Sequence, residues 1–500
     1  MTGPRPPSVE VPPTSGPESG GGPTAPASPL PIGLVCAGCG YRVPDELVFA
    51  PRCPAAGAGD DADHVLHRVV DAGALVWPSD EDPATFVRYR TLSRAYQAAR
   101  AAGWADGDVV HLIRRLDDAV AAVDGGGFRD TPFEPVEELA ARLGSTGGGV
   151  WVKDETGNVS GSHKARHLMG VMLELLIDEA LTGRGRPGPL AIASCGNAAI
   201  AAAVVARAAG RSLDVFVPTW ADATVVARLT RLGANVVACP RAPGDAGDPT
   251  YRALRAAIAG GAIPFTCQGT ENGLAIAGGE TLGYEMVTRL ARPTRAEPHR
   301  TAPELDAVVV QVGGGALASS VAAAFAEARA FGVVRREPRL YAVQTEGCAP
   351  LERAWHRLCE RAAADGMPAA LADARLHRSA YMWPWEPEPT SVAHGSLDAE
   401  TYDWYAIAEA LARTGGDVVV VDEATIAEAN RIGRASTGID ADHTGTAGLA
   451  GLLSLRRRGD VQPDETVAVL FTGAAREGGR GEAPTGSTVA SPQSVERSRR

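Results

Sequence analysis

No stretch of the 500-residue sequence is apolar for long enough to cross a lipid bilayer, which takes about 20 residues. The best candidate, residues 198–206, is short, rich in alanine and followed by Arg207. The N-terminus has no basic region leading into an apolar block, so no secretion signal is indicated. We therefore expect a cytoplasmic protein without a membrane partner.

Clusters of basic residues that would attract a polyphosphate are absent as well. The net charge of −12 at pH 7 repels a nucleic-acid backbone unless a local basic patch intervenes. We find neither the G-x-G-x-x-G fingerprint of a dinucleotide site nor the acidic ribose partner that accompanies it. These absences argue against a nucleic-acid partner and against a nucleotide-dependent oxidoreductase.

The two ends of the sequence have little aromatic or hydrophobic content. Residues 1–30 are rich in proline, glycine, serine and threonine, and residues 474–500 are similar. Segments of this composition cannot bury enough apolar surface to offset the entropy that they lose on ordering. We predict a disordered leader and a disordered tail.

Between the ends, short apolar or β-branched runs alternate with alanine-rich amphipathic stretches. This alternation is typical of βαβ units, which build a parallel sheet covered by helices on both faces. Ligands of such sheets bind beyond the carboxyl ends of the strands, where the strand-to-helix turns lie. The predicted strands are 190–194, 213–217, 235–239, 306–312, 340–344, 417–421 and 466–471, and helices are predicted to begin near Ala223, Tyr251, Asn272, Leu317 and Asp422.

One of these turns carries a lysine. Residues 152–166 (VKDETGNVSGSHKAR) run from a strand through a small polar loop into a helix that Lys164 opens. At the positive end of a helix dipole, in partly buried surroundings, the protonated form of an amine is disfavoured, and the amine becomes a better nucleophile towards an aldehyde. Taken alone, an ordinary surface lysine is the simpler interpretation.

Three further turns combine small and polar residues. Residues 194–197 (SCGN) end a strand and offer main-chain N–H groups that suit a carboxylate, although Asn197 alone also fits a routine helix cap. Residues 313–317 (GGGAL) let main-chain N–H groups converge on a phosphate monoester. Residues 470–473 (LFTG) place the Thr472 hydroxyl at the end of a late strand.

In this order the four motifs resemble those of the fold-type II pyridoxal-phosphate enzymes, and most closely the threonine synthase-like group of the tryptophan synthase β superfamily. The likeness runs from about Thr131 to Gly473. It implies an α/β fold with two parallel-sheet, three-layer domains and the active site between them. Following it, we predict a large cofactor domain from residues 76–185 and 270–473 and a small mobile α/β domain from residues 186–269. The habit of the family implies a homodimer.

The resemblance also implies a role for each site residue. Lys164 would form the Schiff base with pyridoxal 5'-phosphate and then move the substrate α-proton. Thr472 would face the pyridine nitrogen, and a neutral hydroxyl there weakens the electron sink, which favours elimination over transamination. Asn197 would bind the ring hydroxyl, and His163 either reaches the phosphate or packs at the helix start. The remaining implied contacts are Gly313, Gly314, Gly315, Ala316 and Leu317 for the phosphate, and Ser194, Cys195 and Ala198 for the substrate carboxylate.

Several positions depart from the family pattern. Cys195 stands where serine is usual, and Ala198 where a hydroxyl often helps to hold the carboxylate. Ala316 replaces a glycine, which is tolerated only if its φ is negative. Asp442 and His443 stand where Glu-Pro is common. These changes argue against assuming threonine synthesis.

The predicted function is a lyase, or a β- or γ-elimination-replacement enzyme, that acts on a small amino acid. A threonine or serine dehydratase is the nearest alternative reaction, and a non-catalytic partner subunit that keeps the fold is the alternative from another class. A phosphorylated substrate would need a second anion site, for which Arg166, Lys153 and Arg88 are candidate donors.

Three of the eight cysteines cluster near the N-terminus. Cys36 and Cys39 form a C-x-x-C turn that offers two thiolates to one tetrahedral ion, and Cys53 follows. His64 is the best candidate for a fourth ligand and His67 the next. Residues 31–75 are therefore predicted to form a zinc-ribbon-like knuckle or, because a second C-x-x-C is missing, a loop with three reduced thiols.

Overall fold

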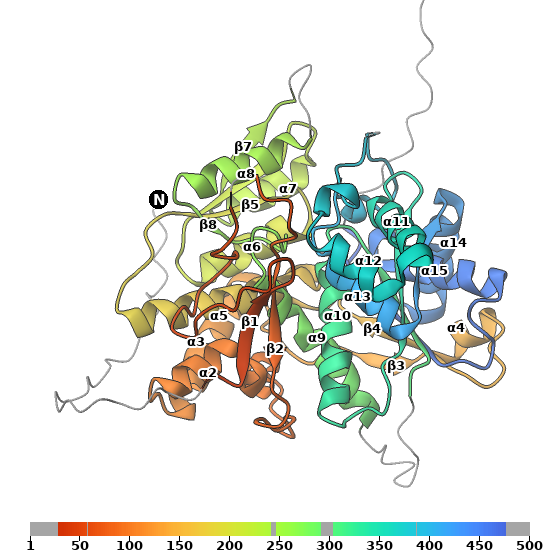
Figure 1. Ribbon diagram of the computed structural model, residues 1–500, viewed down its shortest axis with the longest axis horizontal. Coiled ribbons are helices and arrows are strands. Elements are labelled where there is room, and N and C mark those ends of the chain that lie inside the picture. The colour runs from red at the N-terminus through yellow and green to blue at the C-terminus, as the bar shows by residue number, and fades with distance from the viewer. Residues whose placement is uncertain (1–28, 58, 242–246, 292–303, 387, 477–500) are drawn as a thin grey trace, which may run out of the picture.

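Two parallel sheets covered by helices, together with a two-stranded N-terminal ribbon, make up the computed structural model (Figure 1). It describes residues 29–57, 59–241, 247–291, 304–386 and 388–476. Most of the predicted leader and tail lie outside these residues, although the main chain of Ala474 still hydrogen-bonds Gly161. Within the described part, no helix has both the length and the apolar character that a bilayer span requires.

The larger sheet runs from edge to edge as β11 (Asp417–Val421), β10 (Arg339–Thr345), β9 (Ala307–Gln311), β12 (Val467–Phe471), β4 (Val150–Asp154) and β3 (Phe133–Pro135). Neighbouring strands are parallel, except for the pair β3 and β4. Successive side chains of a strand point to opposite faces. Val308 and Val310 accordingly join one apolar core, and Ala307 and Val309 join another on the opposite face.

Helices cover both faces of this sheet. The first core includes residues of α9 (Ala275–Ala291), α10 (Ala316–Ala330), α11 (Pro350–Asp365), α12 (Met367–Ala374) and α13 (Trp404–Thr414). The second includes residues of α4 (Glu137–Arg142), α14 (Glu423–Thr437) and α15 (His443–Arg458). Burial on both sides explains why β12 is apolar along its whole length, and β9 up to its last residue Gln311, rather than at alternate positions.

The smaller sheet is entirely parallel, in the order β7 (Asn235–Cys239), β6 (Leu213–Pro218), β5 (Leu190–Ala193) and β8 (Ile263–Pro264). Ile192 and Val215 face the core that contains α6 (Asn197–Ala208), whereas Ala191 and Phe216 face α8 (Pro249–Ala259). The remaining elements are β1 (Ile32–Cys36), β2 (Leu66–Val70), α1 (Thr85–Arg88), α2 (Arg94–Ala101), α3 (Asp106–Asp124) and α7 (Ala223–Arg231).

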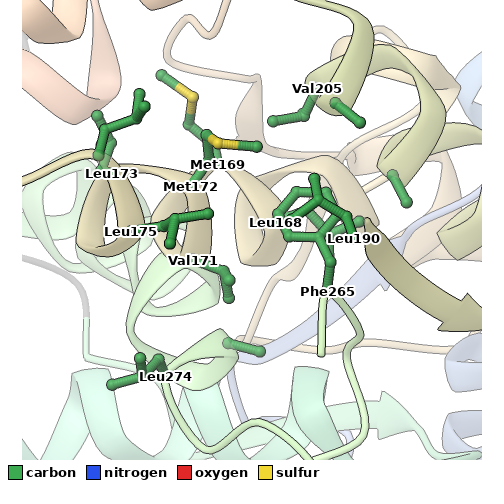
Figure 2. Packing of buried hydrophobic residues seen from close by; sticks show 14 of the residues in the cluster. Leu168, Met169, Val171, Met172, Leu173, Leu175, Leu190, Val205, Phe265 and Leu274 are labelled. Carbon is green, nitrogen blue, oxygen red and sulfur yellow. The ribbon is translucent and has the colours of Figure 1, made fainter. Parts of the chain in front are cut away.

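The helix that follows β4, α5 (Lys164–Thr182), is buried along most of its length. Apolar residues occupy all its sides, as expected for a helix enclosed by other elements. Figure 2 shows Leu168 beside Leu190 and Phe265, all in one apolar core. On another side α5 meets α9, where a Cβ on Gly170 would lie only 2.6 Å from the Cα of Gly278. Two glycines therefore allow the close contact that sets the depth of α5.

All seven predicted strands occur, each within one residue of its predicted bounds. Two predicted helix starts lie just before the observed helices, because the polar side chain at the predicted start binds a main-chain N–H group. Asp422 accepts from Thr425 N, and Asn272 accepts from Leu274 N. The helix predicted to begin near Tyr251 begins earlier, at Pro249, after the cap residue Asp248, which accepts from Thr250 N. The domain bounds and the mobility of residues 186–269 stay predictions.

Candidate functional site

The turns after β4, β9 and β12 meet at the carboxyl ends of these parallel strands. Ser162 forms an isolated bridge with Gly473, and the main-chain N–H of His163 donates to the carbonyl oxygen of Thr472 (3.4 Å). A Cβ on Gly473 would lie 3.0 Å from Nδ2 of Asn197, which begins α6 in the smaller sheet's part of the chain. The four motifs of the sequence are therefore neighbours in space.

Lys164 is the first residue of α5, and its side chain is half-buried. Within the described residues, its amine has neither a hydrogen bond nor an ion pair. The chain contains only two lysines, and the other, Lys153, is fully buried with its Nζ 2.6 Å from a carboxylate oxygen of Glu285. Lys164 is thus the one lysine whose amine is available to an aldehyde.

The glycine loop 313–315 lies between β9 and α10. Gly315 has a φ of +102°, which favours glycine, whereas Ala316 has no positive φ and so meets the condition set by the sequence. No side chain caps the N-terminus of α10. The Gly314 N–H forms a hydrogen bond with the side-chain carboxyl of Asp398. Burial raises the pKa of this carboxyl, and both the nearby Lys164 and the Gly314 N–H partly offset the rise. The loop therefore already binds a carboxyl oxygen, and this carboxyl interacts electrostatically with Lys164.

Thr472 is buried at the end of β12 and is held by Gln311 at the end of β9. Gln311 Nε2 donates to Thr472 Oγ1 (2.6 Å) and also to the carbonyl oxygens of Gly445 (3.0 Å) and Leu470 (3.3 Å). Because the carbonyls can only accept, the amide must present its NH₂ group to all three. The Thr472 hydroxyl therefore accepts from Gln311 and keeps its own proton free to donate.

The turn between β5 and α6 leaves main-chain N–H groups uncapped. Asn197 is the first residue of α6 and does not cap it; the N-cap is Gly196, without a side-chain bond. Arg476 Nη2 donates to Asn197 Oδ1. Burial raises the pKa of the Cys195 thiol to about 11, with smaller contributions from Asp248 and Asp398. Cys195 is thus neutral at pH 7 and adds no charge that would repel a carboxylate.

Ser194 and Ala198 are half-buried in the same turn. Ser194 Oγ accepts a weak hydrogen bond from Gly196 N (3.3 Å). His163 is buried, and burial holds the pKa of its ring well below the ordinary value, so the ring is neutral. Its Nε2 has no hydrogen-bond partner among the described residues.

A buried ion network fixes the start of α5. The Arg166 guanidinium bonds Glu155 through Nε (2.8 Å) and Nη2 (2.9 Å), and Glu285 through Nη1 (2.8 Å) and Nη2 (2.9 Å). Burial alone would raise the pKa of Glu285, but Arg166 and Lys153 hold it down to about 2. The side chains of all four residues are at most 1% exposed.

This network overturns one expectation from the sequence. Arg166 and Lys153 were candidate donors to a substrate phosphate, yet both have no exposed side-chain surface and are committed to carboxylates. Arg88 is also buried and is paired with Asp130 (3.1 Å). A pattern of charges in a sequence does not reveal which of them are enclosed. Arg166 and Lys153 are not free to bind an anion, whereas Nε and Nη2 of the buried Arg88 have no hydrogen-bond partner among the described residues.

The structure brings Cys36, Cys39, Cys53 and His64 together. Their ligand atoms all lie within 4.8 Å of one another, with 3.7 Å between the sulfurs of Cys39 and Cys53 and 3.4 Å between Cys36 Sγ and His64 Nδ1. Thiolates around one tetrahedral zinc ion lie roughly 3.8 Å apart. His64 Nε2 also bonds the carboxylate of Asp60 (2.6 Å), which places the ring proton on Nε2 and leaves Nδ1 free to coordinate a metal. His67 is not part of the cluster.

Sequence reasoning missed Asp398, Arg476 and Gln311, which reach the site from segments without a motif. The scarcity of lysine was a readable signal, because two lysines in 500 residues leave few candidates for an aldehyde-binding amine.

A family model described as pyridoxal-phosphate dependent enzyme matches residues 125–473. The chain belongs to the pyridoxal-phosphate-dependent enzymes. An L-threonine ammonia-lyase of Thermotoga maritima is 26% identical over 332 residues, which are 66% of this chain and 67% of that protein. A cysteate synthase of Methanospirillum hungatei is 29% identical over 149 residues, 30% of this chain and 32% of that protein. The structure of maize serine racemase shares the fold, with a TM-score of 0.53, 19% identity and coverage of 73% of this chain and 94% of that one.

We expect Arg166→Ala to lower the free energy of unfolding by about 3–5 kcal/mol, because it leaves two buried carboxylates with only Lys153 as counter-ion. Arg335→Ala is the matched control: it removes an exposed pair with Glu304 and should cost less than about 1 kcal/mol. Urea unfolding monitored by circular dichroism measures both. The wild-type protein should also lose stability as the pH falls from 4.5 towards 2, where Glu285 takes up a proton. Equal losses in the two variants would contradict the role of the network.

Proposed function

We propose that this pyridoxal-phosphate-dependent enzyme is a lyase that eliminates, or replaces, a group at Cβ or Cγ of a small amino acid. The observation that carries the proposal is the position of Lys164. It is a free amine at the start of α5, within electrostatic range of a carboxylate that the glycine loop binds. Related proteins named as a threonine ammonia-lyase and a cysteate synthase support chemistry of this kind.

The residues present fit the cofactor. The glycine loop has the cradle that a phosphate needs, since a Cβ on Gly313 would lie only 2.6 Å from the Asp398 oxygen that now faces it. Phosphate would take the place of this carboxylate, using the N–H groups of Gly313, Gly314, Gly315, Ala316 and Leu317. The partnerless Nε2 of His163 is a further buried polar atom that the cofactor could satisfy.

When bound, pyridoxal phosphate supplies an electron sink for the bond that breaks at the substrate α-carbon. Lys164 would hold the cofactor covalently and carry the α-proton. Thr472 would donate its free proton to the pyridine nitrogen, and Asn197 would bind the ring hydroxyl. A neutral donor at the nitrogen leaves the sink weaker than a carboxylate would, which favours loss of a leaving group.

The turn before α6 would receive the substrate carboxylate. Its uncapped N–H groups at residues 197 and 198 are the donors, and Ser194 Oγ, which accepts from the Gly196 N–H, is a neutral polar neighbour. The neutral Cys195 thiol and the Ala198 methyl group make this turn less polar than a hydroxyl-lined one. A small amino acid without a charged side chain, such as serine or threonine, suits such a turn.

The homodimer that the family resemblance implies stays a prediction.

The purified protein should absorb visible light through its bound cofactor, and Lys164→Ala should lose this band because no other lysine can replace the amine. Borohydride reduction followed by peptide mass spectrometry should find the cofactor on Lys164. Lys164→Arg is the matched control for charge, since it keeps a cation at the helix start but cannot attach the aldehyde. Cofactor attached elsewhere in the wild-type protein would contradict the assignment.

Incubation with serine or threonine should release ammonia together with a keto acid. O-Phosphohomoserine loses phosphate in both reactions, so phosphate with ammonia and a keto acid indicates elimination, whereas phosphate with a new amino acid and no ammonia indicates replacement. The activity of the Lys164→Ala protein should be at least about a thousandfold lower than that of the wild type, since the group that would move the proton is gone. Chiral chromatography of the remaining amino acid detects racemisation. A protein that holds the cofactor but converts none of these substrates would favour the non-catalytic partner subunit instead.

We also propose that Cys36, Cys39, Cys53 and His64 hold one structural zinc ion. The gathering of four ligand atoms and the Asp60 contact to His64 support it. Metal analysis should find one zinc per chain, and Cys39→Ser should reduce this to below one half. Cys359→Ser is the control, because that cysteine lies in α11, away from the cluster. Zinc content that is zero in the wild type would favour three reduced thiols.

A further inference from the structure

Residues 396–403, which we call the strap, lie along the glycine loop. Thr401 Oγ1 donates to the carbonyl oxygen of Gly313 (3.0 Å). The main-chain N–H of Asp403 donates to the carbonyl oxygen of Gly314 (3.1 Å). A peptide unit is planar and trans, so a fixed carbonyl also fixes the N–H group that follows it. The strap therefore sets the directions of the Gly314 and Gly315 N–H groups.

The strap and the glycine loop are closely packed. A Cβ on Gly315 would lie 3.0 Å from Cγ2 of Thr401 and 3.1 Å from Cβ of Asp403. At the other end of the strap, Ser396 Cα would be 3.0 Å from a Cβ on Gly313. A displacement of the strap would therefore change the loop.

Arg378 ties the strap to the N-terminal knuckle. Its Nη2 lies 2.6 Å from a carboxylate oxygen of Glu400 in the strap, and its Nε lies 3.1 Å from Oδ1 of Asp63. A planar guanidinium can hold two carboxylates in a fixed relation, which a lysine amine does less well. Asp63 is 1% exposed and directly precedes His64.

Main-chain bonds strengthen this junction. Asp63 N donates to the carbonyl oxygen of Arg375 (2.8 Å), and Arg378 N donates to that of Asp61 (2.8 Å). On its other side, Asp63 packs against the C-x-x-C turn, because a Cβ on Gly38 would lie 2.8 Å from the Asp63 nitrogen. Residues 61–64 thus carry a metal ligand and the anchor of the strap within one short segment.

We propose that the metal knuckle holds the phosphate-binding loop in shape through Asp63, Arg378 and Glu400, and that Arg378 and Glu400 are positioning residues for the cofactor phosphate. The proposal rests on the proposed function, since it takes zinc at the knuckle and pyridoxal phosphate at the loop. Loss of the metal would release residues 61–64, then the strap, and then the directions of the loop N–H groups. Cofactor retention would depend on a metal that the cofactor never touches.

Glu400→Ala in the full chain is the sharpest test, because it cuts the link and leaves the Arg378–Asp63 pair and the knuckle intact. We expect zinc content to stay at one per chain. The dissociation constant for pyridoxal phosphate should rise at least tenfold, and amide hydrogen exchange in the peptide around residues 313–320 should be faster in the cofactor-free protein. Arg378→Ala should raise the dissociation constant and the loop exchange rate more than Glu400→Ala does. Arg378→Lys should bring both values part of the way back to those of the wild type.

Arg413→Ala is the matched control. Arg413 lies on α13 and pairs with Glu337, so its loss removes an arginine–glutamate pair that contacts neither the strap nor the knuckle. Its cofactor affinity and loop exchange should stay within twofold of wild type. Cys39→Ser, which removes the metal, should reproduce the faster loop exchange.

Two results would overturn the proposal: loop exchange and affinity within twofold of wild type in Glu400→Ala, or a zinc-free Cys39→Ser protein with an unchanged loop. A wild-type protein that binds no pyridoxal phosphate would instead refute the proposed function. The exchange measurement, which needs no cofactor, would still decide whether the knuckle controls the loop.

Discussion

The position of Lys164 depends on the pairing of Arg166 with Glu155 and Glu285. This ion network lies where water does not reach, so none of its members can leave without stranding an opposite charge, and that makes the arrangement rigid rather than merely stable. Arg166 follows Lys164 by two residues on the same helical turn. The network therefore fixes the origin of α5 relative to β4 and α9, while the Lys164 amine itself has no hydrogen bond or ion pair among the described residues.

The two ends of the cofactor would be held by different physical means. At the aldehyde end, enclosed charges and the close contact between Gly170 and Gly278 leave α5 no freedom. At the phosphate end, the glycine loop depends on hydrogen bonds from residues 396–403, which are supported in turn by the N-terminal knuckle. The amine would thus be held by charges that no water reaches, and the phosphate by a loop whose shape depends on a neighbouring segment.

The sequence predicted the parallel strands well because buried apolar runs and the turns after them are local signals. It also pointed to Lys164, through a short motif, and to Cys36, Cys39, Cys53 and His64, four candidate ligands that the structure brings together. It could not show that Arg166 and Lys153 are enclosed, since burial depends on partners such as Glu285 that lie more than 100 residues away. Asp398 was missed for a related reason: it belongs to a segment without a motif, and only the fold brings it to the glycine loop.

The scarcity of lysine has a consequence beyond catalysis. Aldehydes and other electrophiles that attack amines modify most proteins at many surface lysines, but here one lysine is sealed in the interior and the other would be covered by the cofactor itself. Simple aldehydes form no stable imine with a guanidinium group, so a cationic surface built from arginine offers them no side-chain amine. Imine formation with a lysine would therefore be confined to the one position where the protein would use it.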